Sequence, residues 1–432
     1  MAKTKWLLIA SLVTMLLAVP LFGACNGEEE PPPNGEEPPP AEYTLYIGGS
    51  QSLTGAYAED SAALLSGMQD YVDYVNETKM LAPWRTETFP DNVTLEVLWR
   101  DDELNVEKAL IIYEELKARG ILTYRCSGTS MAMALLDRLN EDRIGATSMA
   151  SGPYLLSPPK TIFTQYPIYT DECAAFAQWF LENWEEDRAP RFAYFTNDAF
   201  GRSILIDEMD EYLEGLGYEI VGTQIVPMVL VGAPPTTALL WLKDNNVDCT
   251  FGCMINPGSQ PTIKEAVRLG MGPGLDYEIT FGFAAPAHLA VFCPAMGVDG
   301  DGVVVGGSYP PLYLTDLPGI AFCNDLLMEY RPDEAEGMHI MYPHGVVEGM
   351  IQVEAVRLAL LEVSADEITP LDVLEYGFYQ IKDLDTGDIT STPLTFGPSD
   401  IEGVDMVRLD QAQGGEVVFL GNYPTLGIYK HE

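Results

Sequence analysis

A short apolar strand that runs through a polar loop into an amphipathic helix is the sequence feature that most constrains this chain. Residues 43–76 read YTLYIGGSQSLTGAYAEDSAALLSGMQDYVDYVN, with the strand first and a Gly-, Ser- and Thr-rich loop at residues 48–55. Apolar residues then recur at the helical spacing i, i+3, i+4 and i+7, namely Leu64, Leu65, Met68, Tyr71, Val72 and Val75. Such a unit opens a parallel sheet, and its loop lies where ligands bind in open α/β sheets.

The same alternation of strand and helix continues and then restarts near residue 171. Further strands are expected near residues 93–99, 120–126, 144–152, 191–195, 218–227, 248–254 and 278–281. Strands that alternate with helices predict parallel sheets covered by helices on both faces. Because 432 residues are too many for one ordinary core, we expect an α/β fold of two lobes.

The remaining segments complete the two predicted lobes. An apolar stretch at residues 302–307 leads back toward the first lobe, which helices near residues 320–330, 345–363 and 370–380 complete. Apolar and polar residues then alternate over residues 404–428 around Gly414 and Gly415, which is a hairpin pattern. We therefore expect a first lobe of residues 43–165 plus 308–388 and a second of residues 166–307 plus 389–432.

The N-terminus has the order of parts of a secretory signal. Lys3 and Lys5 precede an apolar run at residues 6–19, which is too short to span a membrane. Small residues directly before Cys25 resemble a bacterial lipobox, although Phe22 stands where leucine is usual. The resemblance predicts a signal peptide at residues 1–24 and lipidation of Cys25. An ordinary signal peptide with an incidental cysteine is the alternative.

An acidic, proline-rich segment follows Cys25. Residues 28–40 read EEEPPPNGEEPPP, which cannot bury a core, so residues 25–42 are expected to be an extended tether. The formal net charge of −42 excludes nucleic acid and an anionic membrane surface as partners. We expect an extracytoplasmic protein that touches the membrane only through its lipid anchor.

Catalytic and metal-binding patterns are absent from the sequence. It contains no nucleophile elbow, Walker A loop or dinucleotide-binding GxGxxG after a strand, and its four histidines do not have the spacing of a helical metal pair. Six cysteines follow Cys25 without a CxxC, so mostly free, buried thiols are expected, with one long-range disulfide left open. The sequence therefore predicts neither an enzyme nor a cofactor or metal site.

Five short motifs resemble one known family in their order and spacing. They are SLTG at 52–55, DD at 101–102, CSGTS at 126–130, NDAFG at 197–201 and LTFGP at 394–398. The chain is similar, over residues 44–432, to bacterial type I periplasmic substrate-binding proteins of the branched-chain amino acid transport group. This resemblance implies two Rossmann-like lobes with parallel sheets, joined by a three-segment hinge near residues 165–170, 300–307 and 388–396. The lobes would close over a small molecule.

The resemblance also implies which residues contact the ligand. The candidates are Ser127, Gly128, Thr129 and Ser130 after the third strand, Met149, Ala150 and Ser151 after the fourth, Phe200 and Phe283 in the second lobe, and Asp60 and Tyr57 near the pocket mouth. Hydroxyls and helix N-termini suit a carboxylate or carbonyl group. Helix capping is the alternative role for residues 127–130, and core packing is the alternative for the two phenylalanines.

One departure from the family concerns the substrate. Relatives that bind α-amino acids carry an acidic residue after the strand matched by residues 279–281, where this chain reads FGFAA at 281–285. A buried ammonium without a carboxylate is costly, so either Asp60 supplies the charge or the ligand is an organic acid, aromatic acid or amide. We expect a monomer that delivers this ligand to the permease subunits of an ABC importer. A signalling receptor of the same fold is the alternative, and an amidase is a more distant one.

Overall fold

The computed structural model describes residues 41–55, 57–149, 151–156, 161–230, 232–334 and 337–428. The chain divides into two units, Met1–Ala41 and Glu42–Glu432, and the fold described below belongs to the second. The predicted signal peptide, the lipidation site Cys25 and the tether up to residue 40 lie outside the described residues. So does Ala150, one of the predicted ligand contacts.

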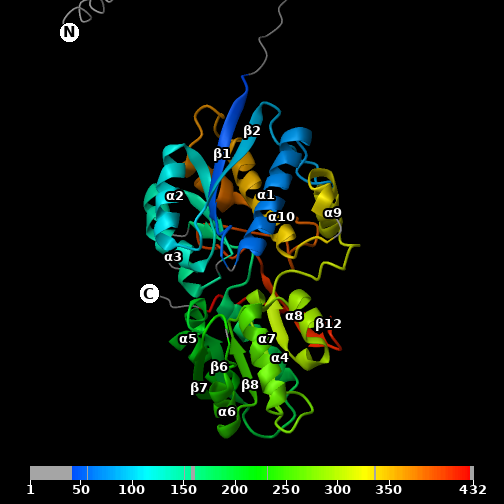
Figure 1. The fold of residues 1–432 in the computed structure, drawn as a ribbon. Helices are drawn as coiled ribbons and strands as arrows, with labels where there is room; N and C mark the ends of the chain where they lie inside the picture. Colours follow the sequence, from blue (N-terminus) through cyan, green and yellow to red (C-terminus); the bar gives the residue numbers. More distant parts are fainter. Residues whose placement is uncertain are drawn as a thin grey trace, which may run out of the picture. The chain divides into compact units, whose positions relative to one another are not determined.

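Five parallel strands form the first sheet, in the order β2-β1-β3-β4-β5. They are β1 (Tyr43–Gln51), β2 (Val93–Asp101), β3 (Ile121–Cys126), β4 (Gly145–Ser148) and β5 (Ile162–Phe163). The helices between them are α1 (Ala58–Thr78), α2 (Val106–Ala118) and α3 (Thr129–Asp142). Figure 1 shows α2 and α3 on one side of this sheet and α1 on the other. The predicted parallel α/β arrangement is confirmed, and we call this sheet with its packed helices lobe 1.

Two helices from later in the chain complete lobe 1. These are α9 (Pro318–Tyr330) and α10 (Met341–Ala359), followed by the short turns α11 (Pro370–Asp372), η6 (Val373–Gly377) and η7 (Phe378–Gln380). Glycines let α10 lie directly on α1. A Cβ at Gly67 would stand 2.2 Å from the carbonyl oxygen of Tyr342, and one at Gly345 would stand 1.9 Å from that of Leu64. The two helix backbones therefore touch where both glycines lie.

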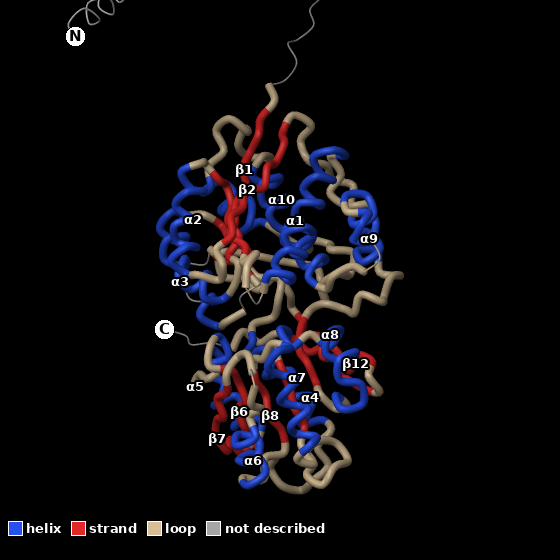
Figure 2. Tube along the Cα trace, in the orientation of Figure 1, coloured by secondary structure: helices blue, strands red, loops and turns tan. Residues whose placement is uncertain are grey.

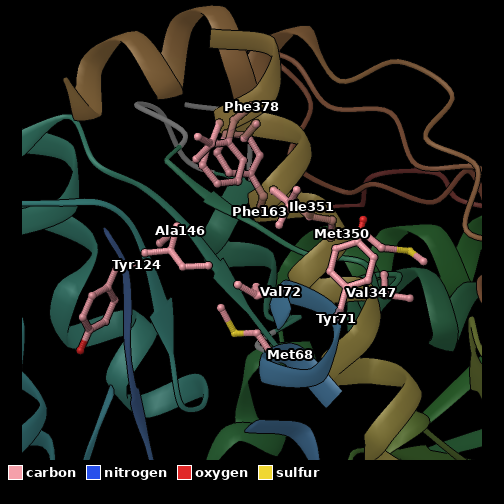
Figure 3. Packing of buried hydrophobic residues seen from close by; sticks show 14 of the residues in the cluster. Met68, Tyr71, Val72, Tyr124, Ala146, Phe163, Val347, Met350, Ile351 and Phe378 are labelled. Atoms are coloured by element: carbon pink, nitrogen blue, oxygen red, sulfur yellow. The ribbon is translucent and has the colours of Figure 1, made fainter. Parts of the chain in front are cut away.

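Aromatic rings fill the core between the sheet and these helices. Phe163 of β5 stacks on Phe378, with ring centroids 4.6 Å apart and planes 4° from parallel, as seen in Figure 3. The same figure shows Tyr71 of α1 beside Met350 of α10. All of these side chains are buried in one apolar cluster. Long-range packing therefore holds the late helices to the N-terminal sheet.

Seven strands form the second sheet, in the order β12-β11-β10-β9-β8-β6-β7. They are β6 (Arg191–Asn197), β7 (Glu219–Val226), β8 (Cys249–Gly252), β9 (Thr280–Phe283), β10 (Val304–Gly307), β11 (Met406–Gln413) and β12 (Glu416–Pro424). The pairs from β6 to β10 are parallel, whereas β11 pairs antiparallel with β10 and β12. Gly414 and Gly415, with φ of 64° and 80°, turn the predicted C-terminal hairpin.

Helices cover the second sheet, and together they form what we call lobe 2. They are α4 (Tyr169–Glu182), α5 (Asp207–Leu216), α6 (Thr236–Asp244), α7 (Asn256–Arg268) and α8 (Leu289–Met296). Short 3-10 turns lie at η1 (Pro153–Leu156), η2 (Phe200–Ile204), η3 (Ala285–Ala287), η4 (Gly297–Gly300) and η5 (Pro332–Glu334). Figure 2 shows the strands of the two sheets as separate groups, each with helices around it. In the described part of the chain, no helix is long and apolar enough to cross a bilayer.

The third connection between the lobes lies further along the chain than the sequence predicts. Leu394, Phe396 and Val404 are buried in the lobe 1 core, whereas Val407 belongs to a core cluster of lobe 2. The ring of Phe396 packs edge-on against Phe163, with centroids 5.4 Å apart. The predicted crossing at residues 388–396 and the predicted start of the second lobe at residue 389 are therefore wrong, because apolar side chains hold residues 389–404 in lobe 1.

Two buried acidic residues join the crossing segments. Oε1 of Glu402 accepts a hydrogen bond from the backbone amide of Ile168 at 2.9 Å, and the carboxylate of Asp171 accepts from the amides of Leu426, Gly427 and Ile428. Burial raises the pKa of Glu402 well above its ordinary value, and the neighbouring Asp171 charge raises it further. Burial also raises the pKa of Asp171, against the amide hydrogen bonds that lower it. Burial and their mutual repulsion therefore favour the protonated form of Glu402.

Replacing Gly67 with alanine is expected to destabilise lobe 1. The added methyl group overlaps the Tyr342 carbonyl, so α1 and α10 must separate, which costs about 1–3 kcal/mol of unfolding free energy. Urea unfolding of Gly67→Ala and wild type measures the loss. Gly215→Ala is the control, because a Cβ there meets nothing within 4 Å and alanine favours the exposed α5 by about 0.5–1 kcal/mol. Equal stability changes for both variants would contradict the close approach.

Glu402 is expected to make stability fall as pH rises. A carboxyl group whose folded-state pKa is raised contributes stability that is fully present below its unfolded pKa of about 4.3 and is lost as pH rises through the folded pKa. Glu402→Gln keeps the hydrogen-bonding shape without the ionisation. Urea unfolding from pH 4 upward should therefore show a smaller loss for Glu402→Gln than for wild type. The exposed Glu362→Gln is the control, and it should follow wild type. Identical pH profiles for all three proteins would contradict a raised pKa of Glu402.

Candidate ligand site between the lobes

A cavity of about 70 Å³ is lined by residues of both lobes. Lobe 2 contributes the loop after β9, with Ala285 and His288, and Asp410 of β11. Lobe 1 contributes His344 at the start of α10. Tyr166, from a connection between the lobes, also lines it. Loops at the carboxyl ends of parallel strands are the usual place for a ligand in such sheets.

An aromatic stack built around His344 forms one wall of this cavity. The imidazole lies 3.6 Å from the ring centroid of Tyr309, at an interplanar angle of 8°, and 5.5 Å from that of Tyr166. A hydrogen bond joins the Tyr166 hydroxyl to Nδ1 of His344. His288 meets the same imidazole edge-on at 6.1 Å. Burial lowers the pKa of His344 well below its ordinary value and that of His288 to about 4, so both rings are neutral at pH 7.

Buried polar atoms without a hydrogen-bond partner lie in and beside this wall. Among the described residues, they include Oδ1 of Asp410 and Oε1 of Gln165. The amide nitrogen of Gln165 donates to the His344 carbonyl at 3.2 Å, so its oxygen is the free end. Nε of Arg408 donates to Oδ2 of Asp410 at 2.8 Å. Such atoms carry a desolvation penalty that a ligand with hydrogen-bond donors would remove.

The N-terminus of α3 carries the predicted residues Ser127, Gly128, Thr129 and Ser130. The Ser127 hydroxyl donates to Oδ2 of Asp102 and does not cap the helix. Asp102 also accepts from the Ser52 hydroxyl at 2.7 Å, so its carboxylate ties together three loops of lobe 1. Gly128 at the N-cap position supplies no side chain, which leaves the first amides of α3 without a side-chain acceptor. The capping alternative is therefore excluded for these residues, and the helix end is suited to an anion.

The predicted contacts after β4 and β6 meet one another. Ser151 is buried, and its carbonyl accepts a hydrogen bond from the amide of Tyr169 at 2.8 Å. The ring of Tyr169 lies 5.6 Å from that of Phe200. The 3-10 turns η1 and η2, one from each lobe, are also in contact. The structure therefore brings Ser151 and Phe200 to the same junction, where both lie beside Tyr169.

Three predicted site residues lie elsewhere. Phe283 is fully buried in the apolar core of lobe 2, which is the packing alternative. Asp60 lies in the first turn of α1, where Oδ1 is 3.5 Å from Nε2 of His339 and burial raises its pKa. Tyr57 precedes the same helix, and burial raises its pKa to about 12. These three residues do not line the cavity between the lobes, and neither do the predicted residues 127–130, Met149, Ser151 and Phe200.

Sequence reasoning missed most of the residues that line the cavity. The fold brings together three lining residues from separate segments, namely His288, Tyr309 and His344. No local sequence motif identifies any of them as a ligand contact. The one available signal was that three of the four histidines fall within residues 288–344. In the described part of the chain, all six cysteines are free and buried, so the long-range disulfide left open by the sequence does not form.

The chain matches one protein family and several solved structures. A family model described as periplasmic binding protein matches residues 44–385. A branched-chain amino acid ABC transporter protein from Thermus thermophilus, solved with bound valine, is 21% identical with a TM-score of 0.75, and the match covers 90% of this chain and 98% of that one. Comparison with curated proteins gives no match.

Two further solved structures have the same fold. The match to a fatty acid ABC transporter substrate-binding protein from Thermomonospora curvata has 18% identity and a TM-score of 0.70, and it covers 89% of this chain and 93% of that one. The match to an ABC transporter solute-binding protein from Rhodopseudomonas palustris in complex with 3,4-dihydroxybenzoic acid has 16% identity and a TM-score of 0.66, with 89% and 98% covered. The family match over most of the chain shows that this protein belongs to the periplasmic binding protein family, whose members bind ligands and are not enzymes.

Proposed function

We propose that this protein is the substrate-binding component of an ABC importer and holds a small organic ligand between its lobes. The observation that carries the proposal is the cavity lined by both lobes beside the segments that connect them. Because its walls belong to different lobes, rotation of one lobe against the other opens or closes the site. Three proteins of the same fold are all described as ABC transporter proteins, which supports this role. One was solved with bound valine, one is described as a fatty acid transporter protein, and one was solved in complex with 3,4-dihydroxybenzoic acid.

The N-terminus of α3 is the proposed place for the polar group of the ligand. Its free amides, with the hydroxyls of Thr129 and Ser130, favour a carboxylate or carbonyl oxygen. Phe200 and Tyr169 would cover the apolar part of the ligand from lobe 2. We therefore keep residues 127–130, residues 149–151 and Phe200 as the proposed contacts, and we add Tyr166, His288, Tyr309 and His344 from the cavity wall.

The charges around the site favour a ligand without an ammonium group. The loop after β9 reads AAPAH at 284–288, without an acidic residue. Glu172 lies behind it and accepts a hydrogen bond from the amide of Ala285 at 3.0 Å, but burial raises the pKa of Glu172 well above its ordinary value. Burial also raises the pKa of Asp410, and Asp60 pairs with His339. An organic acid, aromatic acid or amide therefore suits the site better than an amino acid.

We also propose that the mature protein is a monomer attached to the outside of the cytoplasmic membrane. The proposal rests on the lipobox-like residues before Cys25 and on the acidic, proline-rich segment after it. A tether in the polyproline conformation adds about 3 Å per residue, so the 18 residues at 25–42 could hold the folded unit up to about 50 Å from the lipid surface. That reach would allow the ligand-loaded protein to dock on permease subunits.

A ligand panel is expected to stabilise the protein selectively. Benzoate, benzamide, succinate and leucine are added to the purified protein, and thermal unfolding is followed. Benzoate or benzamide should raise the melting temperature by several degrees, because a ligand at 100 times its Kd contributes about 2.7 kcal/mol. Phe200→Ala should weaken binding about tenfold, equivalent to about 1.4 kcal/mol, whereas the half-exposed Phe419→Ala on β12 should not. Stabilisation by leucine alone would contradict the proposed ligand class.

Replacing Cys25 with serine is expected to release the protein from the membrane. Without the thiol, no lipid can be attached, so Cys25→Ser expressed in a bacterium should appear in the soluble extracytoplasmic fraction. The wild type should stay with the membrane. Intact mass measures the loss of the diacylglyceryl and acyl groups. Cys323→Ser, at a free and buried thiol, is the control and should remain on the membrane. An unchanged mass and location of Cys25→Ser would refute lipidation.

A further inference from the structure

Lobe 2 contains a second cavity that is separate from the site between the lobes. Its volume is about 260 Å³, and it lies between the C-terminal half of α7, the turn η4 and the start of β10. No residue that lines it also lines the cavity between the lobes. Its walls come from lobe 2 alone, so opening or closing of the lobes does not create it.

The interior of this second cavity is apolar. Ile263, Met271, Ile279, Phe281 and Val303 line it, and each of these side chains is at most 3% exposed. An apolar cavity of about 150 Å³ in another protein stays dry and binds benzene, so this larger space is suited to one aromatic ring or a short alkyl chain. Water gains few hydrogen bonds on such walls, and a small apolar molecule gains dispersion contacts there.

The rim of the cavity is apolar and acidic. Val298 is 71% exposed and Leu275 is 42% exposed, so both present hydrophobic surface to solvent at the entrance. Asp299 and Asp301 also line the cavity, and among its described lining residues there is no lysine, arginine or histidine. Oδ1 of Asp301 accepts a hydrogen bond from the amide of Gly414 at 2.6 Å, which fixes that carboxylate in place. The rim therefore attracts a positive charge and repels a negative one.

Two glycines with positive φ shape the wall of the cavity. Gly302 has a φ of 85°, and a Cβ there would stand 2.2 Å from Cγ of Pro273 on the opposite side of the wall. Gly272 has a φ of 143°, which side chains other than glycine rarely adopt. Both glycines therefore let the loop at residues 270–274 pass close to the start of β10. No side chain from either position fills the space.

We infer that this cavity binds a small apolar amine, whose ring or alkyl chain enters the cavity and whose ammonium group faces Asp299 and Asp301. The apolar interior is complementary to the ring or alkyl chain, and the acidic rim is complementary to the ammonium group. The rim is not complementary to an anionic compound. The inference is independent of the proposed role in transport, because it rests on lobe 2 alone. A hydrocarbon would contact only the apolar interior. A carboxylate would be repelled by the negative charges of Asp299 and Asp301 at the entrance.

Calorimetric titration with benzylamine, benzyl alcohol and benzoate tests the inference on the intact protein. Benzylamine should bind this cavity most tightly, and benzyl alcohol several-fold more weakly. Benzoate is proposed above as a ligand of the site between the lobes, so any benzoate binding should be weakened by Phe200→Ala and unchanged by Val267→Phe, which fills the second cavity. Asp299→Asn should weaken benzylamine several-fold and leave benzyl alcohol unchanged, and Asp325→Asn on the exposed face of α9 should change neither. Benzoate binding that Val267→Phe abolishes overturns the role of the rim, and no binding of benzylamine overturns the site.

A variant that fills the cavity locates the bound molecule. Val267 is half-buried on α7 and lines the cavity, so Val267→Phe places a ring in the space and should abolish benzylamine binding while the protein remains folded, as judged by its melting temperature. Phe200→Ala, in the site between the lobes, should leave benzylamine binding unchanged. If Phe200→Ala weakens benzylamine and Val267→Phe does not, the amine occupies the site between the lobes and the inference fails.

Discussion

The pairing of two chain segments that connect the lobes is the constraint on which the rest of the structure depends. The amide of Thr164 donates to the Ile401 carbonyl at 2.9 Å, and the Thr164 carbonyl accepts from the amide of Gly403 at 2.8 Å. Glu402 then binds the amide of Ile168. Gln165 and Tyr166 lie between these fixed points, so the cavity wall they form is positioned by backbone hydrogen bonds. A displacement of one segment would therefore have to move the other or break these hydrogen bonds.

Burial favours the neutral forms of several ionisable groups in and beside the site between the lobes. It lowers the pKa of His288 and His344, and it raises the pKa of Glu172, Glu348 and Asp410, so each group is driven toward its neutral form. Two arginines remain charged there, Arg125 beside Glu348 at 2.7 Å and Arg408 beside Asp410 at 2.8 Å. The other polarity comes from hydroxyls, amides and the N-terminus of α3, which are fixed dipoles. Such a site discriminates among ligands chiefly by the placement of hydrogen bonds and by shape. The acidity of the chain lies mainly on its surface.

The sequence predicts the fold well where a pattern is periodic and local. The stripe of α1, the β-α alternation and the Gly414–Gly415 turn follow from spacing alone. The predicted lobe boundary is wrong for residues 389–404. The sequence could not show that the ring of Phe396 packs against Phe163, more than 200 residues earlier in the chain. The prediction that Phe283 contacts the ligand fails for a related reason. The sequence pattern of a strand does not show which of its faces packs into the core and which faces the ligand. Most of the cavity wall was not predicted, because His344 and Tyr309 meet only through the fold.

Strand β9 lies between the second cavity of lobe 2 and the site between the lobes. Ile279 and Phe281 line the apolar cavity, whereas Ala285, just beyond the end of β9, lines the site between the lobes. A ligand in one cavity could influence the other by shifting β9 along its axis. That strand is hydrogen-bonded on both sides, to β8 and to β10, so a shift would break two ladders at once. Sites separated by a fixed element with no shared partner contribute additively, so we expect the two cavities to bind their ligands independently.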